Sequence, residues 1–180
     1  MERSRIVFSG SGGQGVITAA IILAKAASIF EDRHAIQSQS YGAAARGGAT
    51  RSDVIIDDTQ ILFPKVNQPN ILVSLTQESY TKFSSVIRPG GLLLVDSKYV
   101  TIEKRVDARH ISLPMFNAVI EEIGKPIVFN ICMLGALIGI TNLVQPDSIM
   151  KVLESTIPKD FMEMNKKALD LGMAMGQQYN

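Results

Sequence analysis

The sequence predicts a three-layer α/β fold, in which a mainly parallel sheet has helices on both faces. Two short, continuous apolar runs, 70–75 and 92–95, are typical of strands that are buried on both faces. A helix-like segment separates these runs, as a parallel connection requires. In addition, a glycine-rich turn joins the first strand-like run to a long helix-like one. The chain has 180 residues, so we expect residues 1–180 to form a single domain.

The first part of the chain predicts three strands and one long helix. Residues 5–9 are a β-branched and aromatic run that ends at the glycines. Residues 16–30 are apolar or small at nearly every position, which predicts a helix covered on most sides. Residues 35–39 form a second short strand-like run. Residues 50–57 alternate between polar and apolar, which predicts a partly exposed strand.

The remaining elements follow in a regular order. Residues 57–60 are typical of a hairpin turn that leads into 61–63. A helix is expected between the two buried strands, at 77–87, and a further strand is expected at 108–113. Four more segments have helical character: 115–123, 128–141, 146–155 and 159–175. In the last of them, apolar residues recur every three or four positions and give a face for docking on the body or on another subunit: Phe161, Met164, Ala168, Leu171 and Met175.

Composition and charge exclude several classes of protein. Apolar residues make up 46% of the chain and charged residues 19%, which is the composition of a folded protein. The 18 Lys and Arg nearly balance the 17 Asp and Glu, so nothing indicates a nucleic-acid partner. The most apolar window, 127–140, is shorter than the ~20 residues of a membrane span, and no secretory signal is apparent. We therefore expect a cytoplasmic protein with no membrane partner.

The single cysteine limits the redox chemistry of the chain. Cys132 alone cannot form an internal disulfide, a multi-cysteine zinc site or a cysteine-ligated iron-sulfur cluster. It lies in an apolar segment, which favours a buried and inert thiol. His34 and His110 have no metal-ligand spacing or catalytic partners around them, so surface or packing roles are favoured for both.

The glycine turn is the first candidate site. Gly10-x-Gly12-x-x-Gly15 lies between a strand and a helix, where backbone amides and the helix dipole favour a phosphate. Alternatively, the glycines only permit a close strand-to-helix crossing. A nucleoside triphosphate is disfavoured, because a P-loop requires Lys and then Ser or Thr where Val16 and Ile17 stand. A nicotinamide dinucleotide is weakly supported, because the acidic pair 31–32 precedes the second strand.

The second candidate site is a glycine-rich segment that carries two arginines. Arg46 is followed by Gly47 and Gly48, and Arg51 comes shortly after them. Guanidinium groups suit phosphate or carboxylate, although solvated loop arginines and subunit-interface anchors have the same pattern. Tyr41, just before this segment, could stack on a ring or cover the core.

Two polar residues are minor candidates. Asp96 ends a buried strand, where an open sheet places ligands, but acidic residues at strand ends also cap the turn that follows. Asn130 lies near the start of a predicted helix and could contact the same crevice or serve in helix packing.

These motifs together resemble the gamma subunit of 2-oxoacid:ferredoxin oxidoreductases. The resemblance rests on two segments, 10–15 and 40–52, and on their order and spacing. Later segments of the family are matched by 70–78, 89–97 and 130–137, so the resemblance covers most of the chain.

The residues of the arginine-containing segment indicate which 2-oxoacid the family member would use. The form Tyr-Gly-x-x-x-Arg-Gly-Gly at 41–48 is similar to 2-oxoglutarate-type gamma subunits, whereas pyruvate-type ones tend to have Phe-Gly and a doubled arginine. The alanines at 43–45 replace the more usual proline and acidic residue, which is a departure from the pattern of the family.

The resemblance implies a subunit of an enzyme that oxidatively decarboxylates a 2-oxoacid, reduces ferredoxin and forms an acyl-coenzyme A. It implies alpha and beta partner subunits, and a ferredoxin-like delta subunit where one is present. Thiamine diphosphate and iron-sulfur clusters would lie on these partners, and this chain would help to bind coenzyme A. The residues to which the resemblance assigns that role are Gly12, Gly13, Gln14, Gly15, Tyr41, Arg46, Gly47, Gly48 and Arg51. A purely structural assembly subunit and a stand-alone dinucleotide-binding oxidoreductase are the alternatives.

Overall fold

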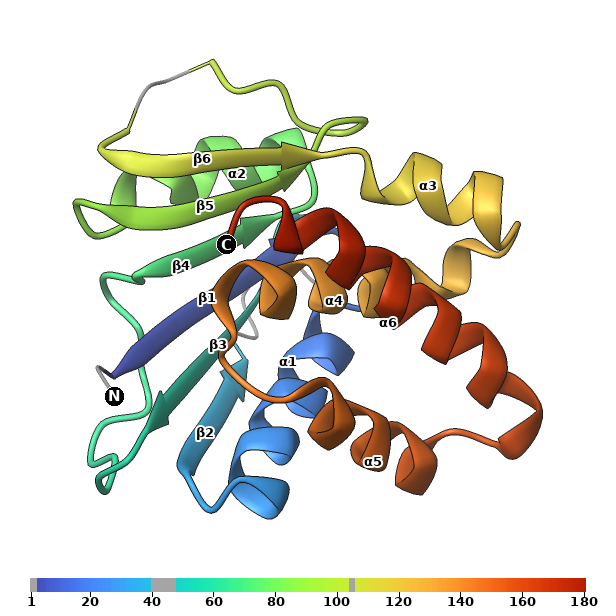
Figure 1. The fold of residues 1–180 in the computed structure, drawn as a ribbon. Coiled ribbons are helices and arrows are strands. Elements are labelled where there is room, and N and C mark those ends of the chain that lie inside the picture. Colours follow the sequence, from blue (N-terminus) through green and yellow to red (C-terminus); the bar gives the residue numbers. More distant parts are fainter. Residues whose placement is uncertain (1–2, 40–47, 104–105) are drawn as a thin grey trace.

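In the computed structural model, which describes residues 3–39, 48–103 and 106–180, a six-stranded sheet forms the centre of the protein (Figure 1). The strand order is β2-β3-β1-β4-β5-β6. The strands are β1 Ser4–Gly10, β2 His34–Gln39, β3 Thr50–Asp57, β4 Ile71–Ser74, β5 Gly91–Asp96 and β6 Ala108–Leu113. Strands β1, β4, β5 and β6 are parallel, while β3 is antiparallel to both of its neighbours. The predicted mainly parallel sheet is confirmed.

Helices cover both faces of the sheet, as the three-layer prediction requires. One face is covered by α1 Val16–Lys25, its π-helical continuation Ala26–Phe30, α4 Phe129–Thr141, α5 Pro146–Thr156 and α6 Met162–Gln177. The other face carries α2 Gln77–Phe83 and the 3-10 turn Ser84–Val86. Helix α3, Met115–Glu122, follows β6 and packs against α4. Two further 3-10 turns, Pro126–Val128 and Lys159–Phe161, lead into α4 and α6.

The apolar strands are buried on both faces because their side chains alternate between two cores. In β1, Ile6 and Phe8 point to the core under α1 and α4, while Val7 points to the core under α2. All six residues of β5 are buried. Continuous apolar sequence is therefore the pattern that these positions require.

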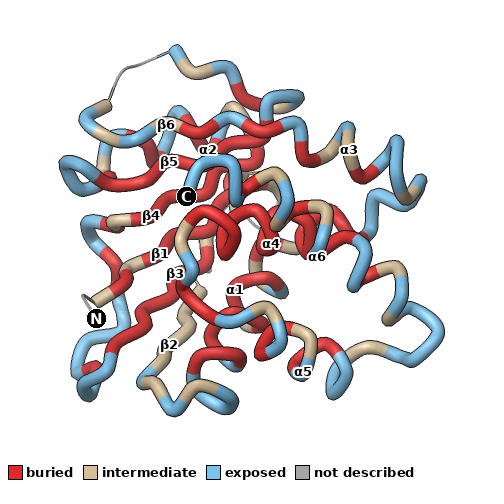
Figure 2. The backbone as a smooth tube through the Cα atoms, viewed as in Figure 1, coloured by how far each residue is buried: buried red, intermediate tan, exposed pale blue. Residues whose placement is uncertain are grey.

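Helix α4 is the most deeply buried helix of the described chain (Figure 2). Every residue from Phe129 to Ile140 is buried. Its close partner is α6, and glycines on both helices let the two backbones touch. A Cβ atom added to Gly172 would lie 1.9 Å from the carbonyl oxygen of Cys132, and one added to Gly135 would lie 2.3 Å from that of Leu169. The predicted docking face of the last helix is only partly right: Ala168 is buried, Met164, Leu171 and Met175 are partly buried, and Phe161 is 51% exposed, because the contact with α4 is centred on the glycines.

Two local expectations are wrong. Residues 61–63 form no strand, and Leu62 and Phe63 are 85% and 59% exposed. Strand β3 is not partly exposed, because Ser52 to Asp57 are all buried. The reason is that β3 lies between β2 and β1, while Ile61 and Val66 from the following loop join the core on its second face. Within the described ranges, no helix has the length and apolarity to cross a membrane.

An ion pair near the N-terminus predicts a specific pH dependence. The Arg3 guanidinium donates to Asp57, and this hydrogen bond is the main cause that lowers the pKa of Asp57 to about 2. Because an unfolded Asp titrates near ~3.9, the pair stabilises the fold above that pH and loses its effect as the pH falls toward 2. Urea unfolding between pH 5 and 2 should therefore show a steeper loss of stability for the wild type than for Arg3→Met. Parallel curves for the two proteins would contradict this assignment.

Candidate functional site

The glycine turn follows β1 at the point where the topology of the sheet reverses. From β1 the chain first builds β2 and β3 on one side, and then β4, β5 and β6 on the other. The crevice at such a switch point, beyond the carboxyl ends of the strands, is where open α/β sheets bind ligands. Gly13 and Gly15 have φ of 88° and 73°, which glycine adopts without strain. The sequence motif therefore forms a turn at the edge of the sheet where folds of this class bind ligands.

Free backbone donors lie at the end of this turn. Gly15 is the N-cap of α1 and offers no side-chain cap. The first intrahelical hydrogen bond runs from the Ala19 amide to the Gly15 carbonyl, at 2.9 Å. The amides of residues 16–18 therefore precede the hydrogen-bonded part of the helix and have no acceptor within it. Together with the helix dipole, these amides favour an anion.

Gln14 braces the turn from inside. Its Oε1 accepts from the Ser11 amide at 2.8 Å, and its Nε2 donates to the Leu75 carbonyl at 3.2 Å. The Leu75 amide in turn donates to the Ser9 carbonyl at 2.9 Å. The Gln14 side chain thus links the turn to the residue that follows β4. It stabilises the conformation of the turn.

Asn130 braces the same turn from the side of α4. Its Nδ2 donates to the Gly15 carbonyl at 3.4 Å, and the residue is only 8% exposed. A Cβ atom on Gly15 would lie 2.6 Å from this Nδ2, so the asparagine occupies the space that any side chain at Gly15 would need. From the sequence, Asn130 could either contact the crevice or serve in helix packing. In the structure it does both, because it lines a cavity beside the turn and packs between α4 and the glycine turn.

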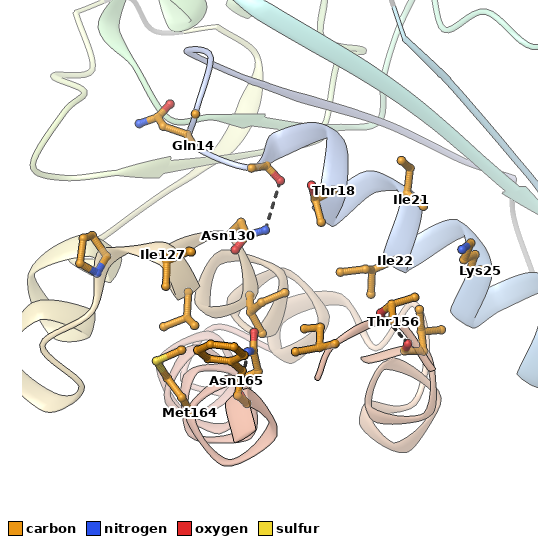
Figure 3. Close-up of a pocket in the computed structure, with 18 residues that line it drawn as sticks. Gln14, Thr18, Ile21, Ile22, Lys25, Ile127, Asn130, Thr156, Met164 and Asn165 are labelled. Carbon is orange, nitrogen blue, oxygen red and sulfur yellow. Dashed lines mark hydrogen bonds between the residues drawn. The ribbon is translucent and has the colours of Figure 1, made fainter. Parts of the chain in front are cut away.

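A cavity of about 500 Å³ opens beside the turn (Figure 3). It lies between α1, the start of α4, α5 and the start of α6. Gly13, Gln14 and Gly15 line one end, and most of the remaining wall is apolar. Asn165 on α6, a residue that the sequence analysis missed, also lines it and is 6% exposed. The only sequence signal for Asn165 is a polar residue next to Met164 in the apolar face of the last helix.

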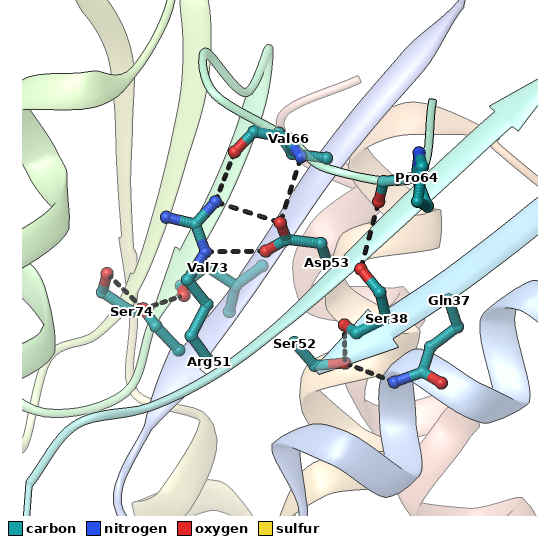
Figure 4. Close-up of polar contacts among 10 residues, drawn as sticks. Gln37, Ser38, Arg51, Ser52, Asp53, Pro64, Val66, Val73 and Ser74 are labelled. Atoms are coloured by element: carbon teal, nitrogen blue, oxygen red, sulfur yellow. Dashed lines mark hydrogen bonds and ion pairs between the residues drawn. The ribbon is translucent and has the colours of Figure 1, made fainter. Parts of the chain in front are cut away.

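Arg51 lies on the opposite face of the sheet from α1 (Figure 4). Its Nε and Nη2 donate to the two carboxylate oxygens of Asp53 at 2.7 and 3.1 Å, and Nη2 also donates to the Val66 carbonyl. The guanidinium carbon is 5.4 Å from the centre of the Phe83 ring of α2. The side chain of Arg51 therefore binds protein groups on the face of the sheet that carries α2. It does not reach the other face, where α1 begins at the glycine turn.

The rest of the second motif lies partly outside the described residues. Tyr41, Arg46 and Gly47 are among the residues that the structure does not describe, and Gly48 is half-buried in a bend. On either side of the motif, Gln39 at the end of β2 pairs with Ser52, and Thr50 at the start of β3 pairs with Gly10. The described ends of β2 and β3 therefore lie at the edge of the sheet that carries the glycine turn.

Asp96 has a capping role in the structure. Its carboxylate accepts from the amides of Lys98 and Phe116 at 2.9 and 2.8 Å. Burial raises the pKa of Asp96 above its usual value. The carboxylate thus holds the turn after β5 and the start of α3, which agrees with the alternative of a capping residue.

The other titratable candidates have no catalytic arrangement around them. Burial raises the pKa of the Cys132 thiol to about 12, so the thiol is protonated near neutral pH. A ring nitrogen of His110, Nε2, lies 3.2 Å from the Val106 carbonyl. Among the residues that the structure describes, no three His, Cys, Asp or Glu side chains gather as a metal site.

Comparisons with known proteins agree on one family. A family model described as pyruvate ferredoxin/flavodoxin oxidoreductase matches residues 5–175. The 2-oxoglutarate synthase subunit KorC of Methanocaldococcus jannaschii is 43% identical over 178 residues, which cover 98% of this chain and 95% of that protein. The keto/oxoacid ferredoxin oxidoreductase gamma subunit of Geobacter sulfurreducens has a TM-score of 0.91 at 39% identity, with 99% of both chains covered.

A more distant likeness concerns the fold alone. The 2-oxoglutarate:ferredoxin oxidoreductase of Magnetococcus marinus, solved with 2-oxoglutarate, coenzyme A and succinyl-coenzyme A, has a TM-score of 0.87 at 19% identity. The match covers 100% of this chain and 32% of that one. The architecture described above therefore also occurs as part of a much longer chain.

Proposed function

This chain belongs to the pyruvate ferredoxin/flavodoxin oxidoreductase family, and from that membership we propose that it is the gamma-type subunit of a 2-oxoglutarate:ferredoxin oxidoreductase. The relative with 43% identity along its whole length supports 2-oxoglutarate as the substrate. The Tyr-Gly-x-x-x-Arg-Gly-Gly motif at 41–48 supports the same substrate.

Within that enzyme, the chain helps to bind coenzyme A. The observation that carries this proposal is the glycine turn at the switch point of the sheet, which leads into the unpaired amides of α1. Nothing lies within 4 Å of the position of a Cβ atom on Gly12, so a diphosphate could approach the backbone there. The acceptor-rich phosphates of coenzyme A match these donors in charge and in hydrogen bonding.

The redox cofactors of the reaction belong to other subunits in this proposal. The only cysteine, Cys132, is buried within α4, so this chain cannot hold a cysteine-ligated cluster. Thiamine diphosphate and the clusters would lie on alpha, beta and ferredoxin-like partners, in a complex that would be cytoplasmic. This chain supplies an anchoring surface for the substrate that accepts the acyl group.

The two arginines of the motif should behave differently. We expect Arg46→Ala to weaken coenzyme A binding by the assembled enzyme about 10- to 150-fold, because a charge-assisted contact contributes about 1.5 to 3 kcal/mol. Arg51→Ala should act on folding, since the buried Asp53 carboxylate loses its charged partner and keeps only the hydrogen bond from the Val66 amide, at a cost of up to about 3 kcal/mol. Titration calorimetry and thermal melting of both variants measure the two effects separately.

The first half-reaction provides the control. Decarboxylation of the 2-oxoacid does not need coenzyme A, so its rate should change little in Arg46→Ala. Wild-type affinity for coenzyme A in a normally assembled Arg46→Ala enzyme would assign that arginine to an interface or a solvated loop. Normal assembly of an enzyme that binds no coenzyme A through this chain would favour the purely structural alternative.

A further inference from the structure

Strand β2 forms one edge of the sheet, and alternate backbone groups of this strand point away from the protein (Figure 1). In an antiparallel pair, every second residue bonds to the neighbouring strand and the others point away from it. The carbonyl of Arg5 in β1 accepts from the Asn70 amide at 3.0 Å, so Arg5 bonds toward β4. Its partner residue on β3 therefore bonds to Ile36 of β2. By the same alternation, the amides and carbonyls of Ala35 and Gln37 point outward.

No other part of the described chain satisfies these outward-pointing groups. Among the described residues, none forms a hydrogen bond with the backbone of Ala35 or Gln37 on the outer side of β2. The Gln37 side chain is turned inward, where its Nε2 donates to Ser52 Oγ at 2.8 Å (Figure 4). The strand also lacks Lys, Arg, Asp, Glu and Pro, with which proteins commonly protect such edges. Its edge is therefore suited to pair with another strand.

Exposed apolar side chains lie next to this edge. The Ser38 hydroxyl donates to the Pro64 carbonyl at 3.1 Å, which brings the loop after β3 to the side of β2 (Figure 4). In this loop, Leu62 and Phe63 are 85% and 59% exposed. Ile36 is partly buried and packs on the same face of the sheet, which is the face that carries α2. An apolar strip therefore adjoins the outward-pointing backbone, as is typical of a protein interface.

The two ends of β2 carry opposite charges. Asp32 is exposed and lies just before the first residue of the strand. Lys65 is exposed and lies beside the other end, where it lines a small cavity together with Ser38 and Gln39. Neither Asp32 nor Lys65 has an ion-pair partner among the described residues. A two-fold axis through the edge makes the strands antiparallel and brings the Lys65 end of each copy to the Asp32 end of the other. The edge is therefore complementary in charge to a second copy of itself.

We propose that two copies of this chain pair along β2, antiparallel about a two-fold axis, so that their sheets become one continuous sheet. The register that uses all of these outward-pointing groups places Ala35 opposite the partner's Gln37, and each such pair exchanges two hydrogen bonds. Ile36 then lies on the axis beside the partner's Ile36, and β-branched pairs of this kind stabilise a sheet. The proposal goes beyond the proposed function, because it concerns assembly and does not depend on coenzyme A.

Disulfide cross-linking of the full chain tests the register. Ile36→Cys should give a covalent dimer on mild oxidation, because the Cα atoms of a non-hydrogen-bonded pair lie about 4.5 Å apart. The natural Cys132 is buried and does not contribute. Ser112→Cys, at an exposed position of β6 on the opposite edge of the sheet, is the matched control and should give no covalent dimer.

A proline at the edge tests the backbone pairing. Gln37→Pro removes an amide hydrogen that points outward, so the bonds between β2 and β3 are retained and the fold should persist. In sedimentation velocity, the dimer dissociation constant should rise at least about 10-fold, because the two-fold axis removes the hydrogen bond twice. Gln37→Ala is the matched control, since it removes the side chain and keeps the amide, and it should dimerise like the wild type. Thermal melting shows whether each variant is folded.

A charge reversal outside the strand tests the same dimer without changing β2. Lys65→Glu should weaken the dimer by about 2- to 10-fold at low ionic strength, because it places like charges at both contacts with Asp32. Adding Asp32→Asn to that variant should restore part of the affinity. Asparagine suits this position, where φ is 51°.

The remaining outcomes overturn the proposal. A wild-type chain that is monomeric at micromolar concentration would do so, and so would a dimer that neither Gln37→Pro nor Lys65→Glu weakens. Covalent dimers of Ser112→Cys without those of Ile36→Cys would place the interface at β6. Cross-linking of Ile36→Cys only to a different subunit in the assembled enzyme would show that another protein covers the edge. None of these measurements involves coenzyme A, so the proposed function stands or fails separately.

Discussion

Gly172→Ala is expected to lower the free energy of unfolding by about 2 to 3 kcal/mol or more, although alanine is the better helix former. The added methyl group would lie 1.9 Å from the carbonyl oxygen of Cys132 and 2.8 Å from the amide nitrogen of Ala136. Both atoms belong to the backbone of α4, which is buried between the sheet and α6 and cannot yield locally. The helices must therefore separate, and close packing is lost along their shared length.

Chemical denaturation of Gly172→Ala against the wild type measures this effect. Ala174→Ser is the matched control, because it adds one heavy atom on the exposed side of the same helix and should change stability by less than ~0.5 kcal/mol. If Gly172→Ala were as stable as the control, α4 and α6 would not be in backbone contact.

The glycine turn and the buried strands could be predicted because their signals are local. A strand, a glycine-rich turn and a helix follow one another within about 20 residues, and short continuous apolar runs such as 92–95 are typical of strands buried on both faces. The exposure of β3 could not be predicted in the same way. Its alternating sequence indicated one exposed face, but Ile61 and Val66 from the next loop cover that face.

The ion pair of Arg51 has a signal in the sequence. Residues two apart on a strand point to the same face, so Asp53 was a candidate partner from the sequence alone. The structure shows this pair, together with the Val66 carbonyl that no local pattern predicts. A charged residue near a glycine-rich segment is thus a weak indicator of a ligand until its strand neighbours are considered.

The cavity could not be predicted because its walls come from four helices that are distant in sequence. Asn165 reaches it only because α6 packs against α4, and that contact depends on glycines that sequence patterns alone did not pair. Asn130 was identified as a candidate for the crevice, yet its contact with Gly15 spans 115 positions of the chain. The positions of both side chains in the cavity therefore depend on tertiary packing, and not on the local conformational preference of the sequence.

Gly12→Val is expected to weaken coenzyme A binding about 10- to 100-fold while leaving the fold intact. Gly12 has no left-handed φ, and nothing lies within 4 Å of the position of an added Cβ atom. A side chain there fits the free protein but occupies the space through which a diphosphate would approach the backbone. Gly15 would not serve this purpose, because its φ of 73° and its contact with Asn130 would make any substitution destabilising.

The dissociation constant of coenzyme A for the assembled Gly12→Val enzyme, measured beside its melting temperature, tests the coenzyme A site most directly. Ser97→Val, at an exposed residue just after β5, controls for an added apolar side chain at the same edge of the sheet. We expect a dissociation constant at least about 10-fold above that of the wild type and of Ser97→Val, with a melting temperature within about 2 °C of both. An unchanged dissociation constant in a fully assembled Gly12→Val enzyme would show that the glycine turn does not hold coenzyme A.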